Sequence, residues 1–216
     1  MKKIFVFFIA ILATFTSCVI TQEYDFNKDF SGTAKTSIDF TQLKMLMAGI
    51  DTTEKSSKAI DSLDVVMAYF ADSLKIVGAK NVNIQWNDDK TIIELSYNFK
   101  NIEILNKSLK INDKLGLSQG RQKPHFELSG WWNKKLSFIV PEFAKNDTSN
   151  SAKSKYEEMD EMLKYNIKFR FASKVKKINN KNYVLNADKK GFAISVKMSK
   201  MTSPDFHAGF KAKIGR

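Results

Sequence analysis

The chain has 216 residues, of which 43% are hydrophobic and 27% are charged, and its formal net charge at pH 7 is +12. This composition excludes a disordered tail and favours a single folded domain. Only three of the 35 basic residues are arginine, which argues against nucleic-acid binding because phosphate and base recognition relies on the planar arginine fork. The excess of lysine suits an anionic lipid or an acidic glycan, although an AT-rich genome produces the same excess without a functional cause.

The first 17 residues have the layout of a secretory signal peptide. Lys2 and Lys3 form a short positive segment, residues 4–13 are an unbroken apolar run, and small residues lead up to Cys18. The apolar run is too short to span a bilayer, which takes roughly 20 residues. We therefore predict that residues 1–17 are removed as a signal peptide and that residues 18–216 form one domain.

Cys18 is the only cysteine of the chain, and it follows a small residue at the end of the predicted signal. This arrangement resembles the lipobox of bacterial lipoproteins, in which the cysteine becomes the lipid-modified first residue of the mature chain; Phe15 stands where those motifs usually carry leucine. A solitary cysteine in an exported protein is either a free thiol or a modified residue. We predict that Cys18 is acylated and tethers the protein to a membrane. An ordinary signal peptide with an incidental cysteine is the alternative.

The first elements are predicted from the spacing of apolar residues. Residues 20–40 form a β-hairpin, because apolar and polar residues alternate on both sides of the turn segment NKDFSG. A short helix is expected at residues 43–47. A long helix follows over residues 60–74, where apolar residues recur at steps of three and four, and Gly78 is placed to end it.

Two further strand pairs follow in the middle of the chain. Residues 82–86 and 93–99 alternate on either side of the turn NDDK, which predicts a second hairpin. Asn101 is positioned to cap a short helix that begins after it. A third pair is expected at residues 126–128 and 136–140, joined through SGWWNKK.

The last third of the chain combines polar segments with strands. The polar residues 145–155 predict a loop, and residues 156–164, YEEMDEMLK, predict an acidic helical segment. The tail after Pro204 receives no assignment. Strands are expected at residues 165–171, 183–185 and 192–198.

Hairpins interleaved with helices are typical of one class of domain. They predict an α+β fold with a largely antiparallel sheet, built from hairpins, and a few helices packed on one face. No internal repeat is visible in the sequence.

Four stretches of strand and turn carry a resemblance: CVITQEYDFNKDFSG, FKNIEILNKSL, YNIKFRFASKVKKI and NADKKGFAISVKM. Together they resemble a group of uncharacterised envelope lipoproteins of Bacteroidota. The resemblance implies a lipidated, exported α+β domain with no assigned activity and no site residue other than Cys18. In some of these bacteria an acidic run after the cysteine directs surface exposure. Here Val19, Ile20, Thr21 and Gln22 follow instead, which favours an outer-membrane protein that faces the periplasm.

One motif indicates a possible enzyme. Residues 116–120, GLSQG, match the G-x-S-x-G nucleophile elbow and would make Ser118 a hydrolase nucleophile, with Asp147 and His207 in a suitable chain order. An elbow follows a hydrophobic strand, whereas the segment before Gly116 is polar, and Pro124 interrupts the helix that should follow. We therefore expect a glycine loop and no enzymatic activity. A serine hydrolase that acts on lipid or cell-wall substrates is the alternative.

No metal site and no cofactor are predicted. His125 and His207 are far apart in the sequence, and the acidic cluster at residues 157–161 has the spacing of a solvated helix face. Trp131 and Trp132 could offer an aromatic platform to a glycan or acyl chain, but a role in the core and its rim is preferred. A carrier of an apolar ligand is a further alternative, and it would need an enclosed pocket.

A basic strand face is the candidate membrane contact. The alternating pattern begins by Ile20, so the domain should start within ~10 Å of the anchor, comparable to the Debye length of about 8 Å at physiological salt. Apolar and basic residues would then occupy opposite sides of a strand that runs from Lys164 to Lys176. The basic residues on one side are Lys164, Lys168, Arg170, Lys174 and Lys176. We predict that they contact an anionic bilayer or envelope component; a merely solvated face is the alternative.

The sequence as a whole favours a lipid-anchored, non-enzymatic binding or structural module of the cell envelope.

Overall fold

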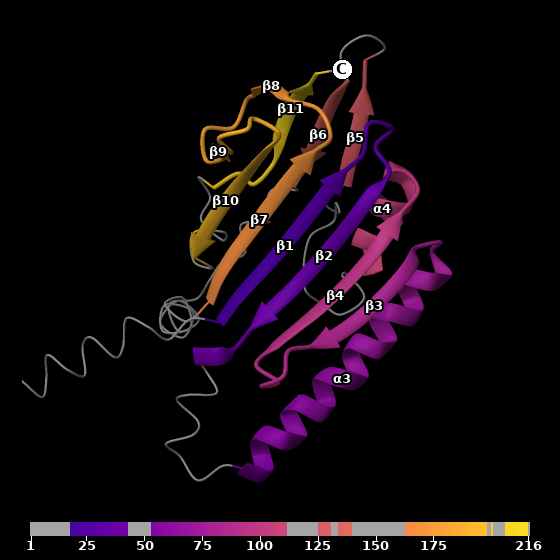
Figure 1. Cartoon of the computed structure of the whole chain (residues 1–216), viewed down its shortest axis with the longest axis vertical. Helices are drawn as coiled ribbons and strands as arrows, with labels where there is room; N and C mark the ends of the chain where they lie inside the picture. The colour runs from indigo at the N-terminus through magenta and orange to yellow at the C-terminus, as the bar shows by residue number, and fades with distance from the viewer. Residues whose placement is uncertain are drawn as a thin grey trace, which may run out of the picture.

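The structure, a computed structural model, describes residues 18–42, 53–111, 125–130, 134–139, 163–197, 200 and 206–215. Within these ranges the strands form two sheets, and the helices α3 and α4 pack against them (Figure 1). The elements in chain order are β1 (Cys18–Phe26), β2 (Gly32–Asp39), α3 (Thr53–Ile76), β3 (Lys80–Trp86), β4 (Ile92–Phe99), α4 (Ile102–Ile111), β5 (His125–Ser129), β6 (Lys135–Ile139), β7 (Leu163–Phe171), β8 (Val175–Ile178), β9 (Val184–Leu185), β10 (Gly191–Lys197) and β11 (Phe210–Ile214).

The larger sheet has the strand order β3-β4-β2-β1-β7-β10-β9. Its central pair, β1 and β7, runs parallel, and the other neighbouring pairs are antiparallel. The β1–β2 hairpin needs a glycine at the first residue of β2. A Cβ atom on Gly32 would clash with the carbonyl oxygen of Asp25. The parallel pair therefore joins an N-terminal half, made of two hairpins, to the C-terminal strands.

The smaller sheet has the order β5-β6-β11-β8 and is antiparallel throughout. It lies behind one end of the larger sheet in Figure 1, while α3 runs along the β3 edge and α4 lies beside β5. The Asn106 side chain of α4 binds both backbone groups of Phe126, at 2.7 and 2.8 Å. In α3, Asp64 accepts a hydrogen bond of 2.6 Å from the indole of Trp86. Both helices are thus fixed to the sheets by side-chain hydrogen bonds.

Aromatic side chains fill the space between the two sheets. The ring of Phe169 on β7 lies 5.3 Å from that of Tyr24 and 4.8 Å from that of Phe210, measured between centroids. Phe126 and Phe192 are also in contact with it, and all four phenylalanines are at most 3% exposed. Edge-to-face and stacked pairs of this kind stabilise a core beyond the area they bury. The inner face of the larger sheet is therefore the hydrophobic core of the molecule.

The α+β class with mostly antiparallel pairing is confirmed, and the predicted hairpins are present, although the strands divide between two sheets. The long helix ends as expected at Gly78, which has a φ of +97°. The carboxamide oxygen of Asn101 accepts a hydrogen bond of 3.0 Å from the backbone N–H of Ile104, which confirms the predicted cap of α4. The short helix at residues 43–47 and the loop at 145–155 lie outside the described residues.

Three assignments were wrong or missing. The strand expected from Lys164 to Lys176 ends at Phe171, and the chain then turns and enters β8 of the other sheet. This turn contains neither glycine nor proline, so no turn-forming residue marks it in the sequence. Leu163 and Lys164, assigned to the acidic helical segment, begin β7 instead, while the rest of that segment is outside the described residues. The tail contains β11, whose five residues alternate but are too few to stand out.

Candidate membrane-anchor site

Cys18 is the first residue of β1, the strand that pairs with β7 at the centre of the larger sheet. Its thiol is partly buried and forms no disulfide. Burial raises the pKa of the Cys18 thiol, and the nearby carboxylate of Asp39 raises it further. Because the thiolate is the nucleophilic form, an elevated pKa is the opposite of what a redox or catalytic cysteine needs. The environment of Cys18 therefore does not favour thiol chemistry.

The strand pairing at Cys18 leaves no linker between this residue and the folded domain. Cys18 pairs with Leu163 in the parallel ladder, and regular pairing continues without a break up to Phe26. At the same end of the sheet β7 also begins, while β2 and β10 end (Figure 1). Any group attached to Cys18 would hold this end of the sheet, which we call the anchor end.

The outer face of the larger sheet carries a row of paired charges away from the anchor end. Glu23 on β1 accepts a hydrogen bond of 2.8 Å from the ammonium group of Lys168 on β7. On the other side, Lys35 of β2 lies 3.6 Å from Glu23 and 3.3 Å from Glu94 of β4. Glu94 also accepts a hydrogen bond from Gln85 of β3. We call these residues, which cross five strands, the ionic ladder.

The electrostatics of the ladder follow from this geometry. Burial alone would raise the pKa of Glu23, but the hydrogen bond and charge of Lys168, together with Lys35, outweigh it and lower the pKa below its usual value. Burial would likewise lower the pKa of Lys35, and the two carboxylates beside it raise it instead. The two cations and the two carboxylates of the ladder are thus paired with one another.

The structure separates the five residues of the predicted basic strand. Lys168 belongs to the ionic ladder, and the guanidinium of Arg170 lies 3.8 Å from the carboxylate of Asp188. Lys174 lies in the turn after β7, and Lys176 is on β8 of the smaller sheet. The five cannot form one strand face because β7 ends at Phe171, although Lys164, Lys168 and Arg170 do share its outer face. Lys164 alone lies at the anchor end.

The other candidate residues are not brought together in the described part of the chain. Ser118, Asp147, Trp131, Trp132 and the acidic cluster lie outside the described residues. His207 is exposed, and its carbonyl oxygen accepts a hydrogen bond from Asn180; the imidazole Nε2 of His125 lies 3.2 Å from Glu127. Among the described residues there is no cluster of three or more potential metal ligands. No helix within these ranges is long and apolar enough to cross a membrane.

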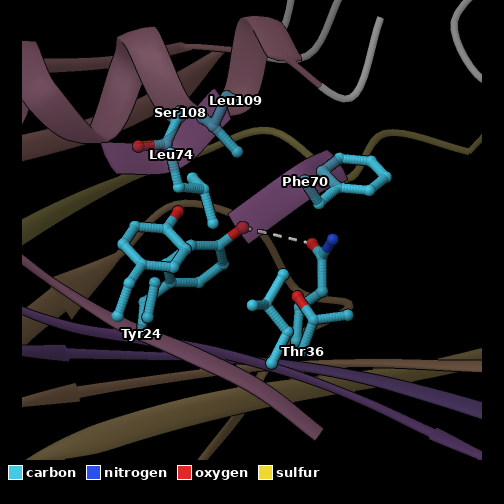
Figure 2. Close-up of a pocket in the computed structure, with 10 residues that line it drawn as sticks. Tyr24, Thr36, Phe70, Leu74, Ser108 and Leu109 are labelled. Carbon is cyan, nitrogen blue, oxygen red and sulfur yellow. Dashed lines mark hydrogen bonds between the residues drawn. The ribbon is translucent and has the colours of Figure 1, made fainter. Parts of the chain in front are cut away.

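A small cavity lies between the inner face of the larger sheet and the two helices (Figure 2). Phe70, Leu74, Ser108 and Leu109 reach into it from the helices, and Tyr24 and Thr36 from the sheet. The hydroxyl of Tyr24 donates a hydrogen bond of 3.2 Å to the Gln22 side chain. The cavity volume is about 30 Å³. It has room for one or two water molecules, whereas ligand pockets measure roughly 300–1,000 Å³, so it does not support the carrier hypothesis.

Comparisons with known proteins return one distant structural likeness. No protein-family model matches the chain, and the search of curated proteins finds no match. Among solved structures, the chain is similar to the NMR structure of the folded domain of the LppM protein of Mycobacterium tuberculosis. The sequence identity is 8% and the TM-score is 0.42, and the match covers 92% of this chain and 89% of that one. A likeness this distant carries no conclusion about what this chain does, and the resemblance to envelope lipoproteins of Bacteroidota stays a prediction from the sequence.

Proposed function

We propose that this protein is a cell-envelope lipoprotein, tethered through acylated Cys18 to the outer membrane and facing the periplasm, and that it acts as a non-enzymatic binding or structural module. One observation carries the proposal. The only cysteine of the chain directly follows a segment with the layout of a signal peptide, and it is also the first residue of the central strand β1. The first strand that the structure describes thus starts at the predicted first residue of the mature chain.

The position of Cys18 supports an anchor in preference to a reactive thiol. A nucleophilic cysteine has a lowered pKa and positively charged neighbours. Cys18 has a raised thiol pKa and Asp39 as its charged neighbour. A lipid attached to the sulfur replaces the titrating proton, so the raised pKa does not oppose this modification.

The test is metabolic labelling of the full chain with an alkyne fatty acid in a bacterial host that processes lipoproteins. We expect the wild type to incorporate the label and Cys18→Ala to remain unlabelled. Intact-mass analysis should place the first residue of the wild-type product at Cys18, with the added mass of the acyl groups. Equal labelling of the two proteins, or a mature chain that begins elsewhere without added mass, would refute the anchor.

Thermal unfolding of residues 18–216 with and without Cys18→Ala provides the control for folding. Cys18 is partly exposed at the start of its strand, so we expect the two melting temperatures to agree closely. A difference in labelling then reports the loss of the sulfur and not the loss of the fold.

A further inference from the structure

The strand register at the anchor end places two lysines next to each other. Lys197 of β10 is the register partner of Lys164 of β7, and Lys164 is also the partner of Val19, the residue after Cys18. Directly opposed residues on neighbouring strands point to the same face, with Cβ atoms about 5 Å apart. Both lysines are exposed. Their ammonium groups therefore share one small area of the outer face, which we call the lysine pair, within two strand spacings, or about 10 Å, of β1.

The charges of the lysine pair are not neutralised by the described residues. Neither Lys164 nor Lys197 forms an ion pair with a residue in those ranges. Lys35 and Lys168 on the same face differ, since each lies within 3.3 Å of a carboxylate oxygen. Asp39 is in the same row, but Val19 separates it from Lys164. Like charges directly opposite each other destabilise a sheet, so this position favours an anionic partner.

We propose that the lysine pair binds anionic phospholipid headgroups of the membrane that holds Cys18. This inference rests on the proposed function, because the acyl group on Cys18 is what brings the anchor end to the bilayer surface. The separation of about 10 Å between β1 and β10 is close to the Debye length of about 8 Å at physiological salt, so both charges act on the surface next to the anchor. Val19, which is partly exposed and is the register partner of Lys164 on the same face, gives the long lysine side chains an apolar base from which to reach the headgroups.

The contact predicted from the structure is end-on. A face-on contact through Lys168 and Arg170 would use cations that Glu23 and Asp188 already pair. An end-on contact uses the cations that lack a described partner, and they lie beside the anchor strand. Lys200, which is exposed and follows β10 by three residues, adds a further positive charge to the same part of the chain.

The experiment uses residues 18–216, which include every residue of the described fold, with one palmitoyl chain coupled chemically to the Cys18 sulfur. A single acyl chain gives only marginal membrane binding, so additional electrostatic contacts are measurable. The binding of this protein is compared between neutral phosphatidylcholine vesicles and anionic vesicles. In the anionic vesicles about 30% of the lipid is phosphatidylserine, which gives the surface a negative potential. Each lysine near an anionic surface strengthens binding about five-fold, so the pair should contribute about 30-fold. We expect Lys164→Gln/Lys197→Gln to lose this preference for the anionic vesicles.

The matched control is Lys176→Gln/Lys211→Gln, which removes the same charge from exposed positions on the smaller sheet. We expect this control to keep the preference, and high salt to abolish it in the wild type. Three results would overturn the proposal: no anionic preference in the wild type, an unchanged preference in the lysine-pair variant, or an equal loss in both variants. If the double variant does not fold, the single Lys197→Gln variant should show about a five-fold loss. Because the palmitoyl chain is added chemically, these outcomes are independent of whether cells acylate Cys18.

Discussion

Consecutive residues of β7 lie in opposite environments on the two faces of the larger sheet. Phe169 is 1% exposed and touches aromatic rings from both sheets, whereas Lys168, the residue before it, lies on the outer face and pairs with one carboxylate. The alternation of a strand produces this division at every step. The inner face supplies the burial that stabilises the fold, and the outer face contributes charges that the fold needs much less.

The outer face is itself divided. Across its middle, the lysines and carboxylates of the ionic ladder form ion pairs with one another. At the anchor end, the lysine pair forms no ion pair with the residues that the structure describes. The ladder charges contribute to stability, and the charges of the lysine pair are left for binding. Substitutions on the inner face, in the ladder and at the anchor end should therefore have progressively smaller effects on unfolding.

The largest effect is expected from the inner face. Phe169→Ala removes a fully buried ring and leaves a cavity between the sheets, which should lower the free energy of unfolding by about 3–5 kcal/mol. Urea denaturation followed by circular dichroism measures the change. Lys168→Ala, one residue away on the outer face, should cost no more than about 1 kcal/mol. Similar losses in the two variants would contradict the division between the faces.

An intermediate effect is expected from the ionic ladder. Glu23→Gln removes the carboxylate that Lys168 and Lys35 share, which should cost about 1 kcal/mol at neutral pH and low salt. The folded-state pKa of Glu23 is lowered, so its contribution is complete above the pKa of the unfolded chain and is lost as pH falls through the folded-state value. Urea denaturation at neutral and acidic pH should show the difference between wild type and variant closing on acidification.

Asp25→Asn is the control for the ladder, because it removes one negative charge from the next outer position of β1. Asp25 is exposed and forms no ion pair within the described ranges, so its replacement should change stability less than that of Glu23. A larger loss from Asp25→Asn, or a difference between wild type and Glu23→Gln that persists in acid, would exclude the ladder as the cause.

The parts of the fold that sequence reasoning predicted are those with strong local signals. The hairpins at NKDFSG and NDDK combine alternating strands with recognisable turn residues, and the long helix has both periodicity and a terminal glycine. The break after Phe171 has no such signal, because Ala172, Ser173 and Lys174 turn the chain without glycine or proline. Residue patterns also do not specify which sheet a short strand joins, so the division into two sheets was not foreseen.

The candidate site was predictable only in part. The position of Cys18 and the early start of the first strand are local features, and the structure has β1 beginning at Cys18. The importance of Lys197 was missed, because it becomes a neighbour of Lys164 through the pairing of β10 with β7. Sequence reasoning also missed the partner of Lys168, because Glu23 is distant in sequence and becomes adjacent only across the parallel pair.

The smallest effect on stability is expected at the anchor end. Lys164→Gln/Lys197→Gln removes two like charges that face each other across β7 and β10, so the free energy of unfolding should stay constant or rise by about 0.5 kcal/mol. Any gain should fade with added salt, because both side chains are exposed. Urea denaturation at low and high salt tests this, with an unchanged denaturant slope as the sign that the fold is intact.

A loss above about 1 kcal/mol would mean that the lysines hold ion pairs within the chain, and it would remove the distinction between the lysine pair and the ladder. A neutral result would show that two cations beside the anchor contribute nothing to folding, so any loss of vesicle binding in the same variant comes from the missing charges.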